Sequence, residues 1–359
     1  MKIILTMVLG LILLLTLIIV IGRSINAKKY KIYTKTGVQK TEYVTLGGIK
    51  QYIQIRGEDA ANPIILVLHG GPGSNMAYYS YDWQSAFEQD YTIVHWDQRG
   101  CGNTFYCNRE GAKPTVDVLL SDVDELVDHL RLTYNKEKII ILGHSWGTFL
   151  GGIYAGKHPE KVSAYVGVSQ MLDFKQSEKV SAEEAIRFAK QISRNKDAAK
   201  IEEQLEGILS YRRIDRKCAA DFLKFRQLKG KYLPNGEELS MRHTMWNIFS
   251  SPYMTSNDLK WLFNFKQLIE SNTELYKELL SEKNLSMYDF SMDYEIPMFI
   301  VAGDCDWITP ISLALDYFND ISAPQKKFIS IEKAGHSPFM DKPAIFSKEL
   351  LEVLDTVEK

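Results

Sequence analysis

Six short apolar segments alternate with helical patterns along this chain, and this alternation constrains its fold more than any other feature. Each segment is a nearly continuous apolar run, as in strands that are buried on both faces of a parallel sheet. The segments occupy residues 63–70, 91–97, 137–144, 162–169, 297–304 and 326–333. Strands that alternate with helices predict an α/β fold, in which a mostly parallel central sheet carries helices on both faces.

The sequence also marks the first and the last elements of this fold. Residues 41–57 form two β-type runs around Gly47 and Gly48, which predicts an opening hairpin. A one-sided apolar pattern predicts a helix that begins near Ser121, with this serine as its N-cap. Pro343 is placed to begin the last helix.

One long stretch interrupts the alternation. From residue 172 to residue 293 the sequence contains helical, charged and aromatic segments but no convincing strand. A helical stretch between two sheet strands predicts an insertion that covers one end of the sheet as a cap. We therefore predict a core formed by residues 28–171 and 294–359, and a helical cap formed by residues 172–293.

An apolar N-terminus precedes this core. Residues 3–22 carry no charged side chain and are long enough to span a bilayer as a helix. Cleaved signal peptides have shorter apolar regions followed by small residues, so we favour a retained membrane anchor over residues 1–27. Basic residues follow the span, but large domains cross membranes largely regardless of charge, so the side on which the domain lies stays open.

Charge and cysteine content narrow the classes of partner. The net charge of −2 gives no indication of a nucleic-acid partner. The four cysteines are too scattered for a disulfide scaffold and lack the spacing of zinc ligands, so we predict no metal site. A bond between Cys101 and Cys107 stays open, as does the oligomeric state.

A serine at a sharp corner is the first candidate catalytic residue. The segment GHSWG at 143–147 directly follows an apolar strand and precedes an apolar helical pattern. In this context G-x-S-x-G forms a nucleophile elbow, because the glycines allow close backbone approach and the turn lifts the hydroxyl out of the sheet. We predict that Ser145 is a nucleophile.

A nucleophilic serine requires a histidine that takes its proton and a carboxylate that orients the histidine. Asp306 and His336 follow the last two apolar segments, where open α/β sheets bind ligands. The chain order Ser, Asp, His is the one expected for a fold with a nucleophile elbow. Asp304 is a rival acid, but we prefer Asp306 because it follows Gly303 by three residues, as is usual for this turn. The glycine-rich segment 68–73, together with the N–H of Trp146, is placed to hold a developing oxyanion.

These motifs resemble those of the α/β-hydrolase superfamily and, within it, of the proline iminopeptidase-like peptidases. The resemblance rests on HGGPG at 69–73, DQRGCG at 97–102, HSWGTFLGGIYAGKHPEKV at 144–162, GDCDWITP at 303–310 and GHS at 335–337. It covers roughly residues 41–171 and 294–359, which are the regions of the predicted sheet.

The resemblance implies roles for five residues. Ser145 is then the nucleophile, Asp306 the acid and His336 the base of a catalytic triad. The backbone N–H groups of Gly71 and Trp146 form the oxyanion hole. The implied chemistry is acyl transfer to the serine followed by hydrolysis, and it requires no cofactor and no metal.

Two departures from the iminopeptidase pattern bear on the substrate. His144 stands where these peptidases usually have glycine, and no tryptophan occurs between Trp146 and Trp246, although the family carries a tryptophan-rich segment with a glutamate there. In the family, glutamates of the cap bind the free amine of the substrate. The candidates to replace them are Glu183, Glu184, Glu202, Glu203 and Glu206, although we favour solvated helix faces for these residues.

The motifs leave three function classes. We expect a membrane-anchored serine hydrolase, and the resemblance favours an aminopeptidase that acts on small peptides. The first alternative is a carboxylesterase or lipase-like hydrolase, or an acyltransferase, placed near lipid by the anchor. The second is a non-catalytic binding protein on the same fold, which the complete set of catalytic residues counts against. In the enzymatic classes the partners are a small-molecule or short-peptide substrate and the membrane.

Overall fold

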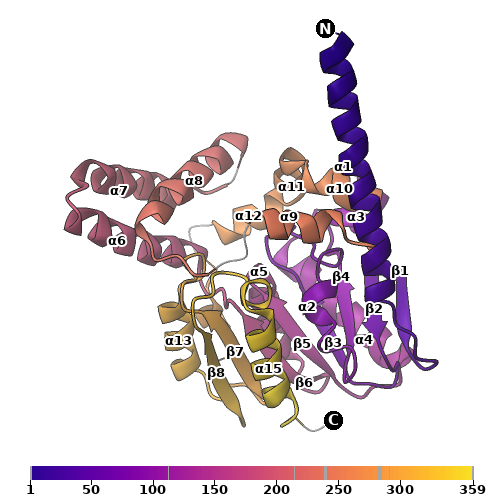
Figure 1. Cartoon of the computed structure of the whole chain (residues 1–359). Helices are drawn as coiled ribbons and strands as arrows, with labels where there is room; N and C mark the ends of the chain where they lie inside the picture. Colours follow the sequence, from indigo (N-terminus) through magenta and orange to yellow (C-terminus); the bar gives the residue numbers. More distant parts are fainter. Residues whose placement is uncertain are drawn as a thin grey trace.

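An eight-stranded sheet in the order β1-β2-β4-β3-β5-β6-β7-β8 forms the centre of the molecule (Figure 1). The computed structural model describes residues 2–111, 113–213, 215–237, 241–280, 285–290 and 292–357. The strands are β1 (Val38–Leu46), β2 (Ile49–Gly57), β3 (Ile64–Leu68), β4 (Thr92–Trp96), β5 (Ile139–His144), β6 (Val162–Val168), β7 (Met298–Gly303) and β8 (Lys326–Ile331). β1 and β2 form the antiparallel hairpin predicted around Gly47 and Gly48, β2 pairs antiparallel with β4, and all other neighbours are parallel. The predicted α/β fold is confirmed.

Helices cover both faces of the sheet, and each face has its own apolar core. One face packs against α4 (Val116–Thr133), α5 (Trp146–Lys157) and α13 (Ile311–Asp320). The other face packs against α2 (Tyr81–Gln84) and α15 (Pro343–Leu354). The short helices α3 (Gly102–Cys107) and α14 (Pro338–Asp341) lie in loops that follow strands. Central strands are therefore buried on both sides, which explains their continuous apolar sequences.

The start of α4 corrects one prediction. The helix begins at Val116 rather than near Ser121, and its N-cap is Thr115. Thr115 has an extended backbone, and its hydroxyl accepts the N–H of Val118 at 3.2 Å. The apolar stripe of the helix starts with Val116, one turn earlier than we expected, so Ser121 lies inside the helix. The last helix does begin at Pro343, as predicted.

Helices and isolated bridges are the only regular elements in the described residues between β6 and β7. The helices are α6 (Phe174–Gln191), α7 (Asn195–Ser210), α8 (Arg216–Lys229), η1 (Gly230–Tyr232), α9 (Met241–Phe249), α10 (Ser256–Leu262), α11 (Phe265–Ser271), α12 (Thr273–Leu279) and η2 (Met287–Asp289). Figure 1 shows α6–α8 as one group and α9–α12 as a second group, both at the same end of the sheet. The first group has a small apolar core of its own.

The N-terminal helix α1 (Lys2–Lys29) projects from the globular part (Figure 1). Its stretch from Ile4 to Lys29 is long and apolar enough to cross a membrane, and the side chains of the apolar portion are exposed. A signal sequence meets the same criteria of length and composition. The C-terminal turns of α1 lie against α2 and α9, so the helix is continuous with the folded domain.

Candidate active site

Ser145 stands at a strained turn between β5 and α5. Its backbone has φ 54° and ψ −119°, a conformation that non-glycine residues rarely adopt. A Cβ on Gly147 would lie 2.0 Å from the carbonyl oxygen of Leu68, and a Cβ on Gly143 would lie 2.5 Å from the carbonyl oxygen of Gly147. Both glycines are therefore required by close packing of the helix start against the neighbouring strands.

Asp306 and His336 come together at the ends of β7 and β8. Nδ1 of His336 lies 2.9 Å from Oδ2 and 3.1 Å from Oδ1 of Asp306. The Asp306 carboxylate also accepts the backbone N–H groups of Ile308 at 2.9 Å and Thr309 at 3.0 Å. Asp304, the rival in sequence, is exposed to solvent. Of the two aspartates, it is Asp306 whose carboxylate is placed to orient the imidazole.

The environment of Asp306 keeps its carboxylate charged. The side chain is completely buried, and burial alone raises the pKa of a carboxyl group. The neighbouring His336 and the hydrogen bonds from Thr309 outweigh burial and hold the pKa of Asp306 at about 2. At neutral pH this carboxylate therefore accepts a hydrogen bond from Nδ1–H of His336, which leaves Nε2 of the ring as the proton acceptor.

Two residues that the sequence did not identify hold the backbone of His336. Nε2 of His144 and Oγ of Ser169 each lie 2.9 Å from the carbonyl oxygen of His336, where both donate a hydrogen bond. Burial, and then the nearby His336, lower the pKa of His144 to about 3, so this imidazole is neutral and carries a proton on Nε2. The histidine that departs from the iminopeptidase pattern is thus a positioning residue for His336.

The loop that follows β3 passes beside the serine. Gly71 has φ +119°, and a Cβ at this position would lie 2.5 Å from the N atom of Gly73. Gln98, at the end of β4, joins this loop to the start of α5. Its side chain donates to the carbonyl oxygen of His69 at 3.0 Å and accepts the indole N–H of Trp146 at 3.1 Å. Gln98 therefore ties the start of this loop to the side chain of Trp146.

A cavity of about 330 Å³ lies beside Ser145 and His336. Ser145, His336 and Gly71 line its floor, and side chains of α6, α8, α11 and α12 cover it. Most of the covering side chains are apolar: Phe174, Phe222, Leu223, Phe265, Leu268 and Ile269, with Met171 from the loop before α6. Among the described residues no carboxylate lines this cavity, and the guanidinium of Arg226 is its one permanently charged group.

The carboxylate nearest to Arg226 is already neutralised. Glu178 on α6 is buried and forms ion pairs with both Arg226 and Lys229 of α8. Sequence reasoning missed this cluster. The glutamates considered for binding an amine lie elsewhere: Glu183, Glu202, Glu203 and Glu206 are exposed, and Glu184 pairs with Arg187. These positions fit our expectation that the five glutamates lie on solvated faces of helices.

A buried polar network joins the cap to the loop beside Ser145. Asn75 donates to Asp258 of α10 at 2.8 Å, and Asn103 donates to the same carboxylate at 2.9 Å and to Asp97 at 3.1 Å. The indole of Trp261 donates to the carbonyl oxygen of Gly73 at 2.8 Å. Burial, and then the neighbouring Asp258, raise the pKa of Asp97 to about 8.

We expect the Asp97→Asn variant to change the pH dependence of stability. An aspartate in the unfolded chain loses its proton near its ordinary pKa of 3.8, whereas folded Asp97 retains it to about pH 8. The contribution of Asp97 to stability is therefore complete below pH 3.8 and declines as the pH rises towards 8, by at most about 1.4 kcal/mol per pH unit. Thermal unfolding in detergent from pH 4 to pH 8 should show the stability of the variant rising relative to the parent. Parallel profiles would contradict the raised pKa.

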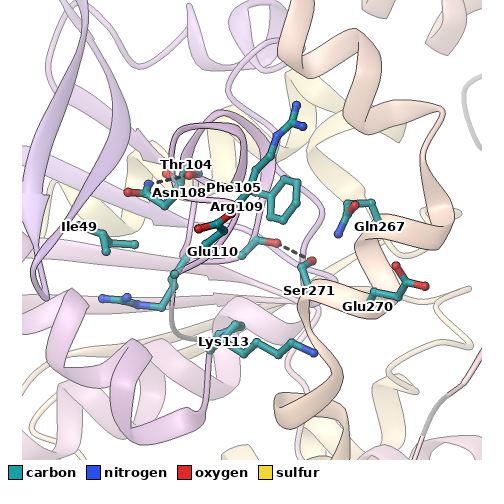
Figure 2. Close-up of a pocket in the computed structure, with 14 residues that line it drawn as sticks. Ile49, Thr104, Phe105, Asn108, Arg109, Glu110, Lys113, Gln267, Glu270 and Ser271 are labelled. Atoms are coloured by element: carbon teal, nitrogen blue, oxygen red, sulfur yellow. Dashed lines mark hydrogen bonds between the residues drawn. The ribbon is translucent and has the colours of Figure 1, made fainter.

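A second cleft, of about 390 Å³, lies between the β1–β2 hairpin, α3 and α11 (Figure 2). Its labelled side chains include Arg109, Glu110 and Glu270, and the hydroxyl of Ser271 donates to the carbonyl oxygen of Gly100 at 2.8 Å. It shares no lining residue with the cavity of Ser145, so we do not place it in the candidate active site.

The cysteines and the potential metal ligands of the described residues form neither a disulfide nor a metal-binding group. Cys101 is buried at the start of α3, Cys107 is exposed at its end, and both are free thiols. No group of three or more histidine, cysteine, aspartate or glutamate side chains in the described ranges has a metal-binding arrangement.

Known proteins similar to this chain agree on the fold. A family model for the α/β hydrolase fold matches residues 63–343. The probable aminopeptidase YbaC of Bacillus subtilis is 27% identical over 326 residues, which cover 88% of this chain and 96% of the relative. A proline iminopeptidase of Lactobacillus delbrueckii subsp. bulgaricus is 27% identical over 321 residues, which cover 88% of this chain and 97% of the relative.

Solved structures show the same architecture at lower sequence identity. A bacterial membrane phospholipase A superposes with a TM-score of 0.61 at 15% identity, and the match covers 99% of this chain and 98% of the other. Epoxide hydrolase VrEH1 from Vigna radiata superposes with a TM-score of 0.53 at 21% identity, covering 90% and 99%. At these identities the likeness extends to the fold only.

Proposed function

The chain belongs to the α/β-hydrolase family, and on this premise we propose that it is a membrane-anchored serine hydrolase with Ser145, His336 and Asp306 as its triad. The observation that carries the proposal is the arrangement of these three residues. His336 is hydrogen-bonded to a buried, charged Asp306, and it lines one cavity with Ser145, which stands on a strained turn. A strained corner of this kind is expected to persist only where it serves a function.

The first half of the reaction acylates the serine. Nε2 of His336 removes the proton of the Ser145 hydroxyl while Oγ attacks the carbonyl carbon of the substrate. Negative charge then develops on the carbonyl oxygen, and the backbone N–H groups of Gly71 and Trp146 stabilise it. His336 gives its proton to the leaving amine or alcohol as the bond to the carbonyl carbon breaks.

The second half of the reaction regenerates the enzyme. His336 takes a proton from water, and the resulting hydroxide attacks the acyl carbon that is bound to Ser145 Oγ. The second tetrahedral intermediate collapses to a carboxylic acid, and the proton on His336 returns to Ser145. Asp306 remains ionised throughout, consistent with its low pKa, and stabilises the imidazolium in both halves.

Two substrate classes have support. The names of the relatives favour hydrolysis of the N-terminal residue of small peptides, which is the first class that we propose. The cavity favours a second class, acyl esters, because no carboxylate of the described residues lines it. The α-amine of a peptide is a cation at neutral pH, and burying it without an anionic partner costs several kcal/mol, about the cost of any unpaired buried charge.

A comparison of amide and ester substrates with the full chain in detergent tests the proposal. Proline and alanine p-nitroanilides should be compared with short-chain p-nitrophenyl esters, and each anilide should be paired with its N-acetylated form. An aminopeptidase loses at least about a hundredfold in kcat/KM on acetylation, since the amine no longer binds its site. An esterase cleaves the esters and leaves the anilides largely intact.

Labelling with a fluorophosphonate separates catalysis from simple binding. This reagent forms a covalent bond only with a serine that is activated as a nucleophile. We expect stoichiometric labelling of Ser145, located by mass spectrometry of the labelled peptide. An unlabelled chain that binds small molecules would contradict a serine hydrolase and favour a binding protein on the same fold.

A further inference from the structure

Large apolar side chains are exposed together on the cap. We call four of these residues the cap patch: Leu223 of α8 (47% exposed), Leu259 of α10 (40%), Phe263 between α10 and α11 (72%) and Phe265 of α11 (50%). A groove of about 430 Å³ runs between Leu223, Phe263, Phe265 and the neighbouring Ile269. Clustered apolar side chains of this size are typical of surfaces that contact a partner or a membrane.

The base of α1 is docked beside this patch. Nε of Arg23 donates to the carbonyl oxygen of Phe249 on α9 at 2.9 Å, and the ring of Phe249 stacks on Phe263 with a centroid separation of 6.4 Å. The side-chain amide of Asn26 donates to the carbonyl oxygen of Ser250 at 3.1 Å. The cap patch therefore begins one helix away from the point where α1 leaves the domain.

Two further contacts fix the direction of α1. A Cβ on Gly22 would lie 2.8 Å from the indole of Trp246, so the helix approaches α9 closely at this point. Tyr30 is buried, and its hydroxyl donates to the carboxylate of Asp82. The apolar part of α1 continues past α9–α11 on the side of the cap (Figure 1). A bilayer that surrounds residues 3–22 then lies next to the cap and away from the opposite end of the sheet.

We propose that the cap patch enters the membrane interface and that substrate reaches Ser145 from the lipid. The inference rests on the proposed anchoring of α1, and it names the bilayer surface as the partner of the patch. Leu223, Phe265 and Ile269 line both the groove and the catalytic cavity. Asn264 and Lys266 also line the groove, which therefore forms a largely apolar path from the interface to the serine. Trp246 is 43% exposed and lies beside Gly22, the last residue of the apolar span. Tryptophan is enriched at this level, where a membrane meets water.

Quenching by spin-labelled lipids tests the position of the patch. The full chain carries Cys107→Ser, Cys218→Ser and Cys305→Ser, which leaves the buried Cys101, and a fluorophore is attached at Phe263→Cys. The matched control carries the fluorophore at Leu132→Cys on α4, where the side chain is 84% exposed. In phosphatidylcholine vesicles with shallow doxyl lipids, we expect about a twofold loss of fluorescence at 263 and almost none at 132.

Flotation and cross-linking distinguish the possible failures. A parent chain that does not float with the vesicles would overturn the anchor itself. A chain that floats but shows equal quenching at both positions would overturn the membrane role of the patch while leaving the anchor intact. A labelled chain that is unquenched at position 263, and whose unlabelled Phe263→Cys form gives disulfide-linked dimers, would assign the patch to a second copy and would likewise overturn the proposal.

Activity provides a second readout of the same surface. The double variant Leu259→Ser/Phe263→Ser changes patch residues that do not line the catalytic cavity. We expect it to lose about tenfold in kcat/KM on a long-chain ester embedded in vesicles, because the interface no longer seats the cap. Its rate on a soluble short-chain ester should equal that of the parent and of Leu132→Ser. An equal loss on both substrates would contradict delivery from the membrane.

Discussion

Replacing Ser145 with alanine is expected to lower kcat by about six orders of magnitude while leaving the fold intact, because the nucleophile is lost and no other group takes over its bond to the acyl carbon. The main chain needs no adjustment. The N–H of Ser145 donates to the carbonyl oxygen of Val168 at 3.0 Å, and its carbonyl oxygen accepts the N–H of Thr148 at 2.8 Å; alanine retains both bonds. The melting temperature should therefore match that of the parent within experimental error.

The measurement is turnover of the preferred substrate together with fluorophosphonate labelling. Ser85→Ala is a suitable control, since Ser85 is exposed on the surface and its hydroxyl donates only to the carbonyl oxygen of Asp82. The control should be labelled and active like the parent, and Ser145→Ala should be neither. Turnover by Ser145→Ala within about tenfold of the parent would contradict acyl transfer to this serine.

The sheet was predictable because burial leaves a strong signature. The central strands are buried on both faces, so each reads as a short apolar run, and the hairpin was marked by two consecutive glycines. The elbow was recognisable for a related reason. Gly143 and Gly147 stand at positions where a side chain would overlap a neighbouring backbone, and such a constraint is visible in a single sequence.

Contacts between distant segments left no such signature. His144 and Ser169 hold the carbonyl oxygen of His336 across 192 and 167 residues, and neither has a periodicity or motif that indicates this role. The pairing of Glu178 with Arg226 likewise depends on how α6 and α8 cross. Charged residues on helices usually form solvated faces, so their pattern alone does not distinguish a buried ion pair from an exposed one.

The packing of the C-terminal turns of α1 against the cap could not be predicted from the sequence either. Composition identified an apolar span, but the bonds of Arg23 and Asn26 to the cap lie just after that span and involve residues about 225 positions away. These contacts place residues 23–26 against the folded domain. In our proposal, the same contacts set which face of the domain meets the bilayer.

Asp306→Asn is expected to lower kcat by about four orders of magnitude, through the tautomer of His336 rather than through its position. The carboxylate now accepts from Nδ1–H of His336 while Thr309 donates to it through its N–H at 3.0 Å and its hydroxyl at 2.8 Å. An amide has only one acceptor oxygen. With that oxygen in the place of Oδ1, where it accepts the backbone N–H of Thr309, the amide NH₂ takes the place of Oδ2 and faces Nδ1. The proton of the imidazole therefore moves to Nε2. Nε2 of His336 then carries a hydrogen and has no free lone pair with which to take the proton of Ser145.

The matched control is Asp304→Asn, since Asp304 is exposed two residues away and its substitution removes the same charge from the same loop. Rates and melting temperatures of both variants should be measured with the substrate that the parent prefers. We expect Asp304→Asn to retain the activity of the parent and Asp306→Asn to lose it while still reacting slowly at high pH, where hydroxide can replace the general base. A loss confined to Asp304→Asn would move the acid of the triad to that residue, and equal activity of all three chains would mean that neither aspartate orients His336.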